Sequence, residues 1–337
     1  MLRLASCIPT SVFLAEIKMK IQNELVDQAT SPDLNRLISH GTGAEQDYAA
    51  LLESIKARLR EAGDLPDATV DQQIRLLKEL SAFELGRFLI ANRGLNAYWT
   101  HQLVTYRPGT VPQGSVPDLE YTFYEKLPAV LATRERFGIF RQQLQALLRP
   151  GLTLASVPCG WMGELLLLDY AQHPDTTLIG IDLDPMALEG AAQLAAERGL
   201  AERLSLHRAD AWAPCLKASV DVLTSNGLNI YEPDDARVTA LYRGFFEMVK
   251  PGGSLVTSFL TPPAALSDQS PSASTQIDQE TLSLQYLIFV RLIDAKWSAF
   301  RTHAQTLQQL EDAGFSDIRF IDDRTCMFPT VIAQKPL

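Results

Sequence analysis

The chain has 337 residues, 46% of them hydrophobic and 21% charged, which indicates a globular protein with a sizeable core and two structural units. Its 40 acidic and 30 basic side chains give a net charge of −10. That balance argues against a diffuse nucleic-acid-binding surface and favours a small or neutral substrate. No apolar run approaches the roughly 20 residues of a membrane span, so no membrane partner is expected.

The cysteines are scattered at positions 7, 159, 215 and 326, with no C-x-x-C spacing and no histidine pairing nearby. This spacing predicts neither a disulfide framework nor a metal site. The first 20 residues are too weakly apolar for a secretory signal, because Pro9 interrupts the run. We therefore expect a cytoplasmic protein.

The region 13–106 shows apolar residues at helical spacing and no strand-like alternation. The turn-rich stretch 107–118 ends it. We predict a helical N-terminal domain over 1–117, acting as a lid or a dimer surface, and a second domain over 118–337. Trp99 belongs to an aromatic cluster at 96–100, where packing between helices is the usual role and a wall of a substrate pocket is the alternative.

Residues 119–148 predict two helices broken near Pro128. Tyr121, Tyr124, Arg134 and Arg136 are candidates to line a cleft from above. Arginines in such helices are more often solvated, and we prefer that interpretation for both of them.

The segment 152–185 reads as a buried strand, a tight turn, a helix over about 163–170 and a second buried strand that ends at Asp182. In doubly wound sheets such units bind ligands at the carboxyl ends of the strands. Gly160 permits a close backbone approach, and Asp182 follows it at the distance expected for a carboxylate that accepts two ribose hydroxyls. Asp184 before Pro185 predicts a helix start, so Asp184 is expected to be structural.

The glycines leave the ligand open. Against the dinucleotide pattern G-x-G-x-x-G, the positions are Pro158, Gly160 and Gly163, so two of three match. An NAD-dependent oxidoreductase is therefore one hypothesis.

The later strands also end in polar residues. After the third strand, 203–207, Asp210 is a candidate to accept from an adenine amino group, with turn capping as the alternative, and Trp212 or Ala211 is expected to pack on the ring. The fourth strand, 220–224, runs into a polar, turn-prone segment at 225–233, which is the candidate reaction centre. Strands are also predicted at 254–259, 318–321 and 330–333. The segment 260–280 is either a flap that excludes water or a plain insertion.

With these strands placed, the chain from about 119 onward resembles the class I S-adenosylmethionine-dependent methyltransferase family. The resemblance rests on six ordered pieces: the Val157–Gly160 turn, Gly180-Ile181-Asp182, Ala209-Asp210-Ala211, Ser225-Asn226-Gly227, Lys250-Pro251-Gly252-Gly253 and Ala313-Gly314-Phe315. Pro158 and Met162 stand where that family usually has glycine. The resemblance implies a doubly wound, mostly parallel α/β sheet of seven strands whose last strand is antiparallel.

The resemblance also implies S-adenosylmethionine as the cofactor and a transferase acting on a small molecule. Carried over by position, the cofactor-binding residues would be Pro158, Cys159, Gly160, Asp182, Leu183, Asp210, Ala211, Trp212, Asn226 and Gly227. Asn226 and Gly227 would lie beside the sulfonium methyl.

Catalysis would consist mainly of aligning the acceptor for in-line attack on that methyl. Asn229 and Tyr231 are the residues we expect to position the acceptor, and Trp99, Tyr121 and Tyr124 are the candidate substrate residues. A non-catalytic cofactor-binding or assembly protein is an alternative. A nucleic-acid base is a poor candidate acceptor, because no Asn-Pro-Pro-Tyr type sequence follows the fourth strand. A homodimer is possible, and the acceptor, the methylated atom and the use of a base stay open.

Overall fold

The computed structural model describes residues 48–213, 216–263, 271, 277–295 and 299–337. The predicted structure of residues 1–47 and of most of the 260–280 flap lies outside these ranges. Six helices of the described chain precede the first strand: α2 (Tyr48–Ala62), α3 (Val70–Leu80), α4 (Glu84–Asn92), α5 (Ala97–Thr105), α6 (Asp118–Glu125) and α7 (Pro128–Leu147). Within the described residues, no helix is both long and apolar enough to cross a membrane.

The remaining chain forms a seven-stranded sheet in the order β3-β2-β1-β4-β5-β7-β6. Only β7 runs against its neighbours, so the predicted α/β architecture with an antiparallel last strand is confirmed. The strands are β1 (Thr153–Ser156), β2 (Thr177–Asp182), β3 (Leu204–Arg208), β4 (Val220–Ser225), β5 (Val249–Ser258), β6 (Ser316–Ile321) and β7 (Thr330–Gln334).

Alternate residues of the central strands feed two cores, one on each face of the sheet. Ala155 and Leu223 pack with α10 (Asp235–Met248) and α12 (His303–Ala313). Leu154 and Val222 point the other way, toward α7, α8 (Gly163–Leu166) and α9 (Pro185–Glu197). This alternation explains why the strands read as continuous apolar runs.

The helix after β1 is shorter than predicted. It ends at Leu166, and the chain then folds back so that the Tyr170 hydroxyl donates to the Leu165 carbonyl at 3.0 Å. By contrast, α9 begins as predicted, because Asp184 accepts from the Met186 amide at 2.9 Å and Pro185 occupies the first helical turn.

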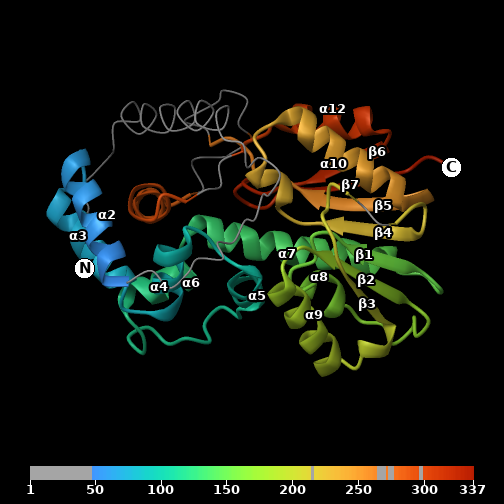
Figure 1. Cartoon of the computed structure of the whole chain (residues 1–337), viewed down its shortest axis with the longest axis horizontal. Helices are drawn as coiled ribbons and strands as arrows, with labels where there is room; N and C mark the ends of the chain where they lie inside the picture. The colour runs from blue at the N-terminus through green and yellow to red at the C-terminus, as the bar shows by residue number, and fades with distance from the viewer. Residues whose placement is uncertain (1–47, 214–215, 264–270, 272–276, 296–298) are drawn as a thin grey trace.

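A separate apolar cluster holds the helical part together. It joins α2 to α6 with α11 (Gln279–Tyr286) and the π-helix η4 (Leu287–Leu292), which follow β5 in the chain. In Figure 1 the orange coil of this late segment lies beside the blue α2 and α3. The cluster therefore contains residues from both sides of the predicted division at residue 117, such as Leu89 and Phe289.

Candidate functional site

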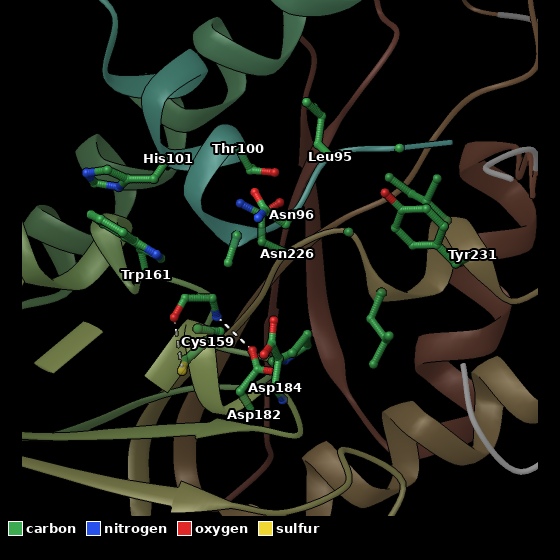
Figure 2. Close-up of a pocket in the computed structure, with 18 of the residues that line it drawn as sticks. Leu95, Asn96, Thr100, His101, Cys159, Trp161, Asp182, Asp184, Asn226 and Tyr231 are labelled. Atoms are coloured by element: carbon green, nitrogen blue, oxygen red, sulfur yellow. Dashed lines mark hydrogen bonds between the residues drawn. The ribbon is translucent and has the colours of Figure 1, made fainter. Parts of the chain in front are cut away.

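A cavity of about 600 Å³ opens at the carboxyl ends of β1, β2, β3 and β4. The strand-end loops form its floor, and helices α4 to α7 and η4 contribute the opposite walls. Figure 2 shows side chains from both parts pointing into this space, with Asp182 on the strand side and Thr100 on the helical side. Ligand sites of doubly wound sheets occur at this edge.

The turn after β1 has the backbone conformation of a glycine-rich loop although it contains one glycine before α8. Gly160 has a φ of 51°, and Met162 has a φ of 55°, which a residue with a side chain rarely adopts. The Met162 side chain is 1% exposed and is packed against Leu165 and Leu178 in the core. Burial of this thioether thus compensates for a strained backbone at a position where the resemblance leads us to expect glycine.

Asp182 joins the two loops that form the centre of the floor. One carboxylate oxygen accepts from the Gly160 amide at 2.9 Å, and the other accepts from the Asp184 amide at 3.0 Å. Burial raises the pKa of this carboxyl above its usual range. A carboxylate has about four acceptor positions, so two stay available to hydroxyl groups in the cavity.

Beyond β3, the position of Asp210 confirms turn capping, and its predicted contact with an adenine amino group stays a prediction. Its Oδ1 caps a turn by accepting from the Trp212 amide at 3.0 Å, and the residue also lines the cavity. Trp212 is held in place because its indole N–H donates to the Arg237 carbonyl at 3.1 Å, while the Arg237 guanidinium lies 5.3 Å from the ring.

At the end of β4, Asn226 is connected to a buried arginine. Arg136 Nη1 donates to Ser258 Oγ at 3.3 Å, and that hydroxyl donates to Asn226 Oδ1 at 3.3 Å. Burial lowers the pKa of Arg136 to about 10. Arg136 lines the cavity and is 6% exposed, so the preferred interpretation of a solvated arginine is wrong for this residue. Arg134 does not line the cavity and donates to the carbonyls of Leu103 and Tyr124.

Glu164 is a second buried charged residue in the same wall, and the sequence analysis missed it. It is 6% exposed, and its Oε1 accepts from Ser156 Oγ and from Thr224 Oγ1. Burial raises the pKa of its carboxyl. In the sequence Glu164 looks like an ordinary acid in the first turn of a helix, a place that the helix dipole favours.

The two predicted acceptor-positioning residues separate in the structure. Tyr231, in the 3₁₀-helix η2 (Leu228–Tyr231), lines the cavity, and Figure 2 shows its ring across the space from Trp161. Burial raises the pKa of its phenol. Asn229 is not among the residues that line the cavity, so the geometry gives no support to its prediction as a catalytic residue. Its side-chain amide donates to the Tyr242 hydroxyl at 2.8 Å, and its backbone carbonyl accepts from Arg301.

The three predicted substrate residues also lie outside the cavity lining. Trp99 is 8% exposed and packs inside the helical cluster, while Tyr121 and Tyr124 lie on the faces of α6 that meet Lys126 and Tyr106. Helices α5 and α6 do line the cavity, but they do so through residues other than the three that were predicted. From α5 the lining residues include Thr100 and His101, and from α6 the lining residue is Phe123.

An aromatic stack connects the helical part to the turn after β1. The His101 and Trp161 rings are stacked with centroids 5.0 Å apart, and Tyr98 meets Trp161 edge-on at 5.5 Å. Burial lowers the pKa of His101, which keeps the imidazole neutral at neutral pH. The tryptophan in turn lies against Gly190 of α9, where an added Cβ would be 2.1 Å from its Nε1.

Comparison with known proteins gives consistent results. A family model described as a methyltransferase domain matches residues 157–253. A crystal structure of a possible exported protein from Bordetella parapertussis is 56% identical, covers 91% of this chain and 100% of that chain, and has a TM-score of 0.83. The ribosomal protein uL3 glutamine methyltransferase of Bradyrhizobium diazoefficiens is 37% identical over 68 residues, which are 20% of this chain and only 21% of that protein. The apo structure of the S-adenosylmethionine-dependent methyltransferase SibL is 18% identical, covers 83% and 77% of the two chains, and has a TM-score of 0.48.

The matched segment, which runs from the turn after β1 to the start of β5, and the order of the strands identify a class I S-adenosylmethionine-dependent methyltransferase domain in this chain.

The cavity residues fit this cofactor at its adenosine end. Asp182 offers free acceptor positions for ribose hydroxyls, and Asp210 and Trp212 lie further along the same edge for an adenine ring. When bound, the cofactor supplies an electrophilic methyl group on a sulfonium centre. Pro158, Cys159, Gly160, Leu183, Ala211, Asn226 and Gly227, which the resemblance assigned to the cofactor, all line the same cavity.

Proposed function

We propose that this methyltransferase acts on a small molecule with an apolar, aromatic-sized body. The observation that carries the proposal is the composition of the cavity beyond the cofactor residues. Its walls there are formed by Phe88, Leu95, Val104, Phe123, Phe137, Phe289 and Phe328. The whole cavity, cofactor region included, has a volume of about 600 Å³, which falls within the range of small-ligand pockets, roughly 300–1,000 Å³.

The position of this apolar region supports the proposal. Its residues come from α4, α5, α6, α7 and η4 on one side and from the segment before β7 on the other. An acceptor would therefore lie between the helical part and the sheet. A small molecule can enter such a space whole, whereas a macromolecule would have to insert one extended side chain. The net charge of −10 also disfavours a nucleic-acid acceptor.

Tyr231 is the residue we assign to positioning the acceptor. Because burial raises the pKa of its phenol, the hydroxyl stays protonated at neutral pH and acts as a hydrogen-bond donor. Its role would be alignment of the acceptor atom with the methyl group, which supplies most of the catalysis in a transfer of this kind. We assign no general base.

The test is a transfer assay with S-adenosylmethionine carrying a tritiated methyl group. A cell extract is split into a small-molecule filtrate and a protein fraction, and each is offered to the enzyme. We expect label from the filtrate to move into an organic solvent, with stoichiometric S-adenosylhomocysteine. With the accepted compound, Tyr231→Phe should lower kcat/KM by about tenfold, the loss of one hydrogen bond, and leave the Kd for S-adenosylhomocysteine unchanged.

Label in the protein fraction alone would contradict this proposal. A protein acceptor is the alternative suggested by the name of the uL3 glutamine methyltransferase, although that match covers a small part of either chain.

We also propose that the enzyme works in the cytoplasm, as a monomer or a homodimer. Within the described ranges Cys159 is a buried free thiol, which suits a reducing compartment. The similar Bordetella parapertussis protein is called a possible exported protein, so cell fractionation with an antibody to this chain is the appropriate measurement. Recovery from the periplasm would contradict the proposed location.

A further inference from the structure

Two buried side chains of opposite charge line the cavity, and the acceptor chemistry proposed above does not use them. Arg136 comes from α7 and Glu164 comes from α8, and each is 6% exposed. Among the described residues they do not form an ion pair with each other or with any other side chain. Charged groups with so little exposure usually have a charged partner, because removing them from water is costly. Asp323 is the first charged neighbour of Arg136 and Glu164 is a weaker one. The Asp323 carboxylate already accepts from Thr325 and from the Phe328 amide.

The hydrogen bonds of Arg136 leave donors unused. Nη1 donates to Ser258 Oγ, and Nε is buried with no hydrogen-bond partner among the described residues. The guanidinium carbon lies 5.0 Å from the centre of the Phe328 ring, which covers one face of the group. A guanidinium presents five N–H donors in a fixed fork that matches a carboxylate. Arg136 lines the cavity, so those of its donors that face the cavity are available to an anionic oxygen.

Glu164 has the opposite charge to Arg136 and therefore favours a cationic group of a ligand. The Ser156 and Thr224 hydroxyls both donate to Oε1, and neither donates to Oε2. These hydroxyls belong to β1 and β4, the two central strands, so the carboxylate sits at the middle of the sheet edge. Glu164 and Arg136 line the same cavity, and their hydrogen-bond partners Thr224 and Ser258 lie on the neighbouring strands β4 and β5.

A neighbouring carboxylate and guanidinium that are not paired together are complementary to a zwitterion. In an α-amino acid an ammonium and a carboxylate are attached to one carbon atom, so one ligand group satisfies both side chains at once. The strand order places this pair on the β1 and β4 side of the sheet edge, whereas Asp182 ends β2 and Asp210 follows β3. The adenosine end of the cofactor and its amino-acid end would then occupy opposite ends of the row of strand termini.

We propose that Glu164 and Arg136 recognise the amino-acid end of S-adenosylmethionine, with the Glu164 carboxylate accepting from the α-ammonium and the Arg136 guanidinium donating to the α-carboxylate. This assignment concerns cofactor binding and is independent of the acceptor.

The experiment is calorimetric titration of the full chain with two ligands. S-adenosylhomocysteine has the amino-acid end, and 5′-methylthioadenosine has the same nucleoside and thioether without it. The variants are Arg136→Met and Glu164→Gln, which keep the size of each side chain and remove its charge. Asp182→Asn is the control for the nucleoside end.

We expect each of the first two variants to bind S-adenosylhomocysteine roughly 10- to 100-fold more weakly, the size of a charge-assisted hydrogen bond, and to keep the wild-type affinity for 5′-methylthioadenosine. Asp182→Asn should weaken the binding of both ligands. Retained binding of 5′-methylthioadenosine shows at the same time that the variants are folded.

A second pair of ligands separates the two roles. S-adenosylmethionine and decarboxylated S-adenosylmethionine differ in the α-carboxylate alone. The wild type and Glu164→Gln should prefer the first ligand, and Arg136→Met should bind the two about equally. Arg136→Lys, which keeps the charge, should restore part of the preference.

Three results would overturn the proposal. Unchanged affinity of Arg136→Met and Glu164→Gln for S-adenosylhomocysteine would assign the pair to the acceptor instead. An equal loss of affinity for S-adenosylhomocysteine and 5′-methylthioadenosine in these variants would mean that the pair maintains the shape of the pocket. An undiminished preference for the carboxylated ligand in Arg136→Met would remove the arginine from the assignment.

Discussion

Asn229 illustrates how a polar residue at a strand end can belong to the structure and not to the chemistry. Its side-chain amide is buried against Tyr242 of α10. Its backbone carbonyl accepts from Arg301, which is 2% exposed. Arg301 also donates to the Glu232 carbonyl and to Asp235. The segment after β4 is therefore held to α10 and to the start of α12 by one polar network.

We predict that Asn229→Ala lowers the free energy of unfolding by about 1–3 kcal/mol, because it removes a buried hydrogen bond that the Tyr242 hydroxyl accepts. The Kd for S-adenosylhomocysteine should stay within a factor of two. Urea unfolding and calorimetry measure the two quantities. The double variant with Tyr242→Phe should cost less than the sum of the single variants. Weaker cofactor binding without a loss of stability would contradict the structural role.

The site residues that could be predicted from the sequence are those that directly follow a predicted strand. Asp182, Asp210 and Asn226 each follow a buried strand, and parallel strands bring their ends to one edge. Glu164 and Arg136 lie in helices, and whether a helical charge meets solvent or a cavity depends on packing against distant elements. No local pattern distinguishes Arg136, which lines the cavity, from Arg134, which does not.

At the scale of elements, the contact between α9 and the turn after β1 sets one wall of the site. Trp161 fills the space above Gly190, and its other neighbours are His101 and Tyr98 of α5. The tryptophan thus lies between the sheet domain and the helical part, and its position depends on the absence of a side chain at residue 190.

We predict that Gly190→Ala destabilises the protein by about 1–3 kcal/mol and weakens cofactor binding, because the new Cβ would displace Trp161. Gly138→Ala is the matched control. Gly138 also lies within a helix, and nothing lies within 4 Å of a Cβ added there, so that variant should be more stable by about 0.5–1 kcal/mol. Thermal unfolding with and without S-adenosylhomocysteine measures both effects. Similar behaviour of the two variants would contradict the role given to Trp161.

Apolar periodicity and the turn signals at the strand ends were sufficient to place all seven strands, although β3 and β6 contain only half-buried and exposed residues. Periodicity was insufficient for α5 and α6. Both helices are short and carry aromatic residues around much of their circumference. Periodicity therefore pointed to Trp99 and Tyr124, whereas Thr100 and Phe123 line the cavity in the structure. A narrow apolar stripe is needed before periodicity can select a face.

At the scale of the molecule, the helical part and the sheet are connected three times. The chain passes from α6 to α7 and on to β1, leaves the sheet after β5 to form α11 and η4, and returns through 299–302 to α12. Phe289 and Leu292 of η4 pack in the same cluster as Leu89 of α4 and Phe123 of α6. The predicted domain division at residue 117 stays a prediction, with this shared cluster lying across it.

We predict that a fragment of residues 118–337 does not behave as an independent domain. Removal of α2 to α5 would leave the buried apolar faces of α6 and η4 in water, and such a surface promotes association. Size-exclusion chromatography should show aggregates or higher oligomers, whereas the fragment 48–337 serves as the comparison that keeps the cluster intact. A monomeric 118–337 fragment that binds S-adenosylhomocysteine would establish the division at 117.

The late arrival of η4 in the helical cluster has a consequence for biosynthesis. On the ribosome, Val130 emerges long before Ile288, and both belong to this cluster. At about 5–20 residues per second, the interval is roughly 8–30 s. Throughout that interval the N-terminal helices of the nascent chain expose the apolar surface that η4 later covers. Chaperone dependence during translation is therefore expected to depend on when residues 287–295 leave the exit tunnel.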